Sequence, residues 1–146
     1  MTKIFICDSC SQPIMNVREG WVEWHRSTAS ASDPQLQGLR LVHHSSRCQY
    51  DGDVLWQDKR VLMDGALADF LGDDGLMRLL TFIHEGEFSN NDEVLEMIKR
   101  LHVNGYEAAF RNFKNAIYSG VFEPNTPENY HWQSDIQATI DEFGEQ

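Results

Sequence analysis

The chain has 146 residues, of which 41% are hydrophobic, and its formal net charge is −11. This composition excludes a largely disordered chain and suits one compact domain, or a small module docked on a larger one. No run of about 18 apolar residues occurs, so we expect no membrane span. The apolar stretch before Cys7 is too short for a secretion signal, and we therefore expect a cytoplasmic protein.

The negative charge is concentrated in the C-terminal part. Residues 56–146 carry a net charge of −10, whereas residues 1–55 carry −1. Binding to nucleic acid relies on an excess of Lys and Arg, so this balance disfavours a general phosphate-binding role. The acidic part would instead suit a protein partner with a basic surface.

The first third of the chain reads as β structure. Short runs of bulky and β-branched residues predict strands over residues 3–6, 18–27 and 39–44. Residues 27–38 are rich in Ser, Asp, Pro, Gln and Gly, a composition typical of a loop. We therefore expect the second and third strands to form a hairpin.

From about residue 56 the hydrophobic period becomes helical. Apolar residues recur at i, i+3, i+4 and i+7, and Gly or Asn residues supply the stop signals. This pattern predicts an extended loop over residues 122–132 and helices over residues 61–71, around 76–83, 92–102, 106–119 and 135–143. We expect an α+β fold in which a small zinc-stapled β-hairpin module, residues 1–55, packs on a unit of four to five helices, residues 56–146.

The three cysteines indicate a metal site. Cys7 and Cys10 form a Cys-x-x-Cys pair, and Cys48 follows His43 and His44 after a predicted strand. In a reducing cytosol this spacing favours metal binding over a disulfide. One histidine and three thiolates supply the four tetrahedral ligands that zinc prefers. We favour His43, because it shares a strand face with Leu39 and Leu41, but His44 and the more distant His25 stay open.

These spacings resemble those of zinc-ribbon and treble-clef-like modules over about residues 3–50. The resemblance implies that two ligand pairs hold one Zn²⁺, carried over here to Cys7, Cys10, His43 and Cys48. The second pair is a His followed by a Cys, where many ribbons repeat the Cys-x-x-Cys. A redox Cys-x-x-Cys is the alternative, although its usual βαβ context is absent.

The other patterns have simpler explanations. Trp21, Glu23 and His25 alternate along a strand, which fits either a recognition surface or core packing. His84 and the next three residues contain one half of a two-His metalloprotease motif, so we interpret them as a helix end. The helix pair over residues 92–119 has the order of a helix-turn-helix but no net charge.

A filled Cys3His set leaves no coordination position for water, so we expect a structural metal. The function that the sequence favours is that of a small cytoplasmic zinc-binding protein, a non-enzymatic interaction or adaptor module. The alternative is a nucleic-acid-associated regulator that uses the 92–119 helix pair or the arginines of the zinc module, Arg18, Arg26, Arg40 and Arg47. A zinc hydrolase with an open site near Glu23, His25, His43 and His44 ranks third.

Overall fold

The computed structural model describes residues 3–29, 35–122 and 131–143. Backbone contacts divide the chain into two compact units, Met1–His102 and Val103–Gln146. The expected α+β class is confirmed. The β strands and the helices α2 and α3 belong to the first unit. The two units therefore divide at residue 102, later in the chain than the expected boundary between residues 55 and 56. That expected domain boundary stays a prediction.

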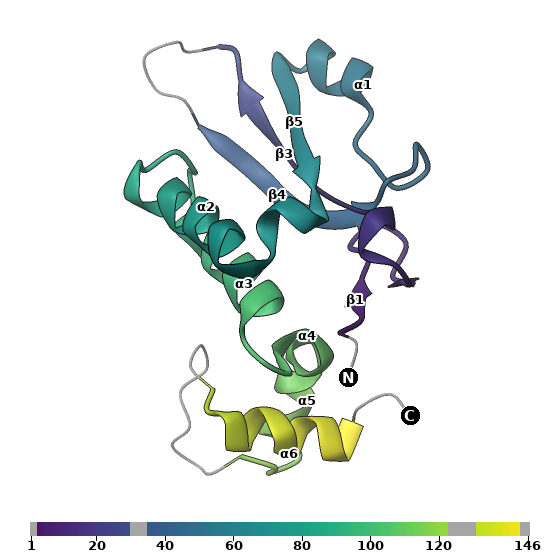
Figure 1. Ribbon diagram of the computed structural model, residues 1–146, viewed down its shortest axis with the longest axis vertical. Coiled ribbons are helices and arrows are strands. Elements are labelled where there is room, and N and C mark those ends of the chain that lie inside the picture. The colour runs from purple at the N-terminus through teal and green to yellow at the C-terminus, as the bar shows by residue number, and fades with distance from the viewer. Residues whose placement is uncertain (1–2, 30–34, 123–130, 144–146) are drawn as a thin grey trace. The chain divides into compact units, whose positions relative to one another are not determined.

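The first unit holds two antiparallel sheets (Figure 1). The small one is the hairpin β1–β2, and the larger one has the strand order β4-β3-β5. In chain order the elements are β1 (Phe5–Ile6), β2 (Pro13–Ile14), the 3-10 turn η1 (Val17–Glu19), β3 (Gly20–Ser27), β4 (Leu36–His43), α1 (Gly52–Gln57), β5 (Arg60–Ala66), η2 (Leu67–Phe70), α2 (Gly72–His84) and α3 (Asn91–His102).

The expected N-terminal strands are confirmed. β3 and β4 pair as an antiparallel hairpin, with an irregularity in the register between Glu23 and His25. Of the loop expected between them, residues 30–34 lie outside the part that the structure describes.

The helix expected over residues 61–71 is wrong. Residues 60–66 form strand β5, which pairs with β3 along its whole length, and the 3-10 turn η2 follows. A short apolar run such as Val61 to Met63 fits a buried strand as well as a helix, and pairing with β3 decides between them. Gly65 allows close packing there, because a Cβ on it would lie 3.0 Å from the Phe70 ring.

Helices α2 and α3 form the other side of the first core. Trp24 lies edge-on to the rings of Phe70 and Phe82, with centroid separations of 5.9 and 5.4 Å. Both helices form as expected around residues 76–83 and over 92–102, and they bury Leu79, Phe82, Val94 and Leu101. Leu80, which the helical period also placed on the apolar face of α2, is 44% exposed. Trp24 is thus a core residue, as the packing interpretation of the tryptophans expects.

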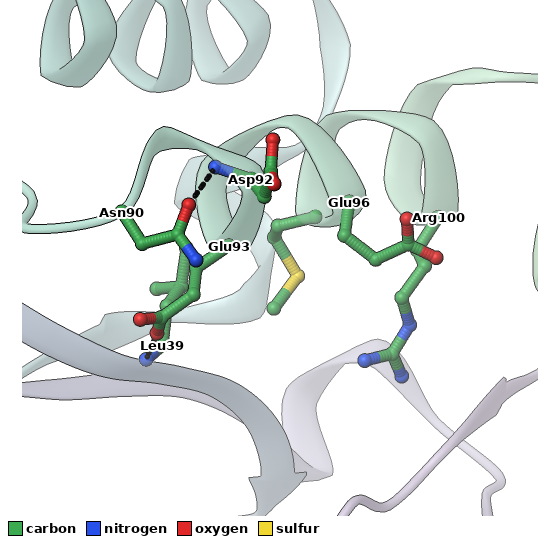
Figure 2. Close-up of a pocket in the computed structure, with 7 residues that line it drawn as sticks. Leu39, Asn90, Asp92, Glu93, Glu96 and Arg100 are labelled. Atoms are coloured by element: carbon green, nitrogen blue, oxygen red, sulfur yellow. Dashed lines mark hydrogen bonds between the residues drawn. The ribbon is translucent and has the colours of Figure 1, made fainter. Parts of the chain in front are cut away.

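The outer edge of β4 is closed by hydrogen bonds from three other segments. The carboxylate of Glu93 reaches from α3 and accepts from the N–H groups of Gly38 and Leu39, at 2.8 and 2.9 Å (Figure 2). Two consecutive N–H groups point outward because Gly38 has a φ of 77°, a conformation that favours glycine. The remaining outward N–H groups on β4 belong to Leu36, Leu41 and His43, and their acceptors are Glu87 O, Asp8 Oδ2 and Cys7 Sγ.

The second unit contains α4 (Tyr106–Ala109), η3 (Phe110–Asn112), α5 (Phe113–Tyr118) and α6 (Gln133–Phe143). The continuous helix expected over residues 106–119 is interrupted by the 3-10 turn η3. Tyr106 stacks on Phe110 at the end of α4, with ring centroids 5.5 Å apart. The last expected helix is confirmed as α6. Of the loop expected over 122–132, residues 123–130 lie outside the described part.

Replacing Glu93 by Ala should leave two backbone N–H groups of β4 without their acceptor. An unsatisfied, partly buried donor costs about 1–3 kcal/mol, so we expect a loss of that size in the free energy of unfolding. Chemical denaturation of the zinc-supplemented protein measures it. Glu85→Ala, an exposed change just after α2, is the matched control. Equal stability of the two variants would contradict the assignment of Glu93.

Candidate metal centre

The first two cysteines lie in the tight turn of the β1–β2 hairpin. Cys7 directly follows β1, and its N–H donates to Gln12 O at 2.9 Å. The N–H of Ser11 donates back to Cys7 O at 2.9 Å, and Ser11 takes a φ of 65°. This closed turn brings the side chains of Cys7 and Cys10 to one side of the hairpin, as a zinc knuckle requires.

The other two candidate ligands, His43 and Cys48, are brought together by the loop that follows β4. His43 is the last residue of the strand, and Ser45 N–H donates to His43 O at 2.8 Å. The N–H groups of Cys48 and Gln49 both donate to Ser45 O at 2.9 Å. The loop therefore folds back on itself and places Cys48 beside His43.

The structure brings the four predicted residues together. One ligand atom from each of Cys7, Cys10, His43 and Cys48 lies within 4.8 Å of the others. His43 Nδ1 lies 3.4 Å from Cys10 Sγ and 3.8 Å from Cys48 Sγ. A tetrahedral zinc ion with bonds of about 2.3 Å to sulfur and 2.0 Å to nitrogen would separate N and S ligands by roughly 3.5 Å. The donor set and its spacing therefore fit a zinc ion.

A hydrogen bond fixes which nitrogen of His43 faces the cysteines. His43 Nε2 lies 3.1 Å from Pro13 O. A carbonyl oxygen only accepts, so Nε2 donates to it, and in the neutral tautomer Nδ1 then keeps its lone pair toward the cysteine sulfurs. A backbone carbonyl in this position is the usual orienting partner of a metal-binding histidine.

The other two histidines considered as ligands lie elsewhere. The ring of His44 stacks on Trp21, with centroids 4.2 Å apart and an interplanar angle of 9°. His25 Nδ1 accepts from Arg60 Nε, and its ring lies edge-on to Tyr50. The histidine beside the three cysteines is thus the one that strand alternation favours, His43.

The thiols have unequal acidities in the absence of a cation. Burial acts to raise the pKa of Cys7, but backbone N–H groups of Cys10, His43 and Ser9 outweigh it and lower that pKa to about 7. Burial, then the neighbouring sulfurs of Cys7 and Cys10, raises the pKa of Cys48 to about 11. A divalent cation at the centre would offset this mutual repulsion, since metal binding favours the deprotonated ligands.

Asp8, between the first two cysteines, anchors the knuckle to the rest of the first unit. Its N–H donates to Leu41 O at 2.7 Å, and its carboxylate accepts from Leu41 N–H at 2.8 Å. The same carboxylate forms a 2.8 Å ion pair with Arg100, which is 5% exposed on α3. Arg100 also donates to Ile6 O at 3.2 Å. Sequence spacing gives no sign of these contacts, because they join residues more than 30 positions apart.

A second, partly buried ion pair contacts the backbone of Cys48. Glu23 is fully buried on β3 and accepts from Arg40 Nε at 2.7 Å and from Tyr50 N–H at 3.0 Å. Arg40 also donates to Cys48 O at 2.9 Å, and its guanidinium lies 3.7 Å from the centroid of the Tyr50 ring. Glu23 and Arg40 thus hold the backbone at Cys48 and at Tyr50, directly after the candidate ligand.

Of the residues in the hydrolase hypothesis, His43 and His44 line one pocket. Glu23 is paired with Arg40, and His25 is bonded to Arg60, so neither of these two lines that pocket. His84 is the last residue of α2, and Gly86 follows with a φ of 64°, so the sequence after it is a helix end as expected.

The described part of the first unit contains a pocket at the metal cluster and another beside α3. One adjoins the metal cluster and is lined by Cys10, Arg18, Glu19, His43, His44, Ser45, Arg47 and Cys48. The other, beside α3, is lined by Leu39, Asn90, Asp92, Glu93, Glu96, Met97 and Arg100 (Figure 2). Glu93 and Arg100 already bind the β4 edge and the knuckle there.

Among the residues that the structure describes, no helix has the length and apolar content needed to cross a membrane. Comparison of the chain with protein-family models, with curated proteins and with solved structures found no match.

Replacing His43 by Ala should lower zinc affinity by at least ~100-fold, because loss of an orienting partner alone costs about 10–100-fold. His44→Ala is the matched control and should bind zinc as the natural sequence does. Competition with a chromophoric chelator measures both affinities. A larger loss in the His44 variant would contradict the assignment of the fourth ligand.

Proposed function

We propose that the chain is a non-enzymatic zinc-binding protein, in which one Zn²⁺ bound by Cys7, Cys10, His43 and Cys48 staples the first unit. The observation that carries this proposal is the meeting of four good zinc donors from two distant segments. Four protein ligands fill the tetrahedron and leave no position for a reacting water, which favours a structural role over catalysis.

In this proposal the metal stabilises the β1–β2 hairpin. The β1–β2 hairpin pairs only two residues on each strand, too few for stability without further support. Zinc would join this hairpin to the end of β4 and to the loop that follows it. Because the ligands are separated by up to 41 positions, binding would also close a long loop of the chain.

In this proposal the exposed surface of α2 and α3 binds another protein. Helices α2 and α3 carry exposed apolar side chains, with Met77 63%, Leu80 44% and Leu95 43% exposed. Residues 56–146, which contain both helices, have a net charge of −10. Apolar residues within an acidic region suit a partner whose surface is basic around an apolar centre.

Three thiolate ligands also suit a reducing compartment, and we propose that the protein is cytoplasmic.

A second candidate is a nucleic-acid-associated regulator. It is favoured by the pocket beside the metal cluster, where Arg18 and Arg47 are both exposed. Of the other module arginines, Arg40 is paired with the buried Glu23 and is not available for phosphate. Titration with random DNA or RNA at about 50 mM salt tests this candidate, because phosphate contacts are strongest at low salt. Absence of binding there would exclude it.

Protein purified without added zinc should contain one zinc per chain and three thiols that react only after chelation. Removal of the ion should unfold the hairpin and lower the melting temperature, since metal binding contributes directly to folding. Metal analysis, thiol titration and circular dichroism before and after chelation measure these changes.

Cys10→Ser should reproduce the chelated state, with less zinc and a lower melting temperature. Ser9→Ala is the matched control, because it changes an exposed neighbour in the same turn. Unchanged zinc content and melting in Cys10→Ser would contradict the structural role. Three thiols that react freely from the start would favour the redox interpretation of Cys7 and Cys10.

A further inference from the structure

The two edges of the three-stranded sheet differ. In an antiparallel pair the N–H and C=O groups of alternate residues point toward the partner strand. Thr28 N–H donates to Lys59 O at 2.8 Å, in the register that pairs Ser27 with Arg60. By alternation, the backbone groups of Val61 and Met63 point toward β3 and those of Arg60, Leu62 and Asp64 point outward.

The outward groups of β5 have no partners within the part of the chain that the structure describes. On β4, by contrast, every outward N–H from Leu36 to His43 is bonded, to Glu87, Glu93, Asp8 or Cys7. An open edge of this kind is a template for pairing with another strand. β5 contains no proline or bulge that would prevent such pairing, and its register with β3 is regular over seven residues.

The charges along β5 are self-complementary. If two β5 strands pair antiparallel around a two-fold axis at Leu62, Arg60 of each copy lies opposite Asp64 of the other. Leu62 then lies opposite its own copy, and the three outward residues of each strand form hydrogen-bonded pairs. Opposite charges at directly facing positions stabilise an antiparallel ladder. The Arg60 guanidinium already bonds within its own chain to His25 Nδ1 and Gln35 O, so a facing Asp64 would add to these contacts.

We propose that the protein self-associates through β5, forming a six-stranded sheet continuous across two copies. Exposed apolar residues next to the edge support this, since α1 runs directly into β5 and carries Val54 and Trp56, which are 52% and 67% exposed. A two-fold contact along β5 brings the α1 helices toward the interface, where large aromatic residues are enriched. None of the proposed metal ligands lies on β5, so the self-association and the zinc site can be tested independently of each other.

The experiment is sedimentation velocity of the full-length, zinc-supplemented protein over a range of concentrations. A single strand pair is smaller than a standard interface, so we expect a monomer–dimer equilibrium with a Kd between about 10 μM and 1 mM. Asp64→Lys places like charges opposite each other twice and should raise the Kd about tenfold or more. Glu85→Lys makes the same charge change away from the edge and should leave the Kd unchanged.

Leu62→Pro supplies an independent variant. It removes an N–H that points away from β3, a position where an edge strand tolerates proline. We expect a folded monomer with normal zinc content. Amide exchange at residues 60, 62 and 64 of the natural sequence should also slow as its concentration rises. A protein that stays monomeric to about 1 mM, or a dimer that Asp64→Lys and Leu62→Pro both leave intact, would overturn the proposal.

Discussion

The docking of the β1–β2 hairpin on the outer edge of β4 is the contact on which the proposed site depends. Asp8 exchanges two hydrogen bonds with the backbone of Leu41, and the N–H of His43 donates to Cys7 Sγ at 3.4 Å. Through these bonds the hairpin continues the hydrogen bonding of the larger sheet. They also bring the turn that holds Cys7 and Cys10 to the end of β4, where His43 and Cys48 lie.

Two ion pairs, each with one fully or nearly buried partner, connect this contact to the rest of the first unit. Arg100 holds Asp8 from α3, and Arg40 joins the buried Glu23 to the carbonyl of Cys48. A buried ion pair adds little net stability, but breaking one is costly because it leaves a charge uncompensated. These pairs therefore favour one arrangement of the hairpin, the sheet and α3. Loss of the metal should therefore also destabilise the packing of α3, because Arg100 joins this helix to Asp8 of the knuckle.

The candidate ligands could be predicted from sequence because their signals are local. The two-residue spacing of Cys7 and Cys10 indicates a knuckle, and strand alternation is enough to prefer His43 over His44. The strand β5 could not be predicted in this way, since Val61 to Met63 fits either a helix or a strand and only pairing with β3 decides. Asp8, Glu93 and Arg100 were missed for the same reason, because their partners lie 33, 54 and 92 positions away.

The central claim is that one zinc ion joins the knuckle to the end of β4, and X-ray absorption at the zinc edge of the purified protein tests it most directly. The account predicts three sulfur neighbours at about 2.3 Å and one nitrogen at about 2.0 Å, with no further oxygen ligand. Two sulfurs with oxygen neighbours, or a site that fits only light atoms, would contradict it. That result would mean that at least one cysteine of the cluster does not bind the metal.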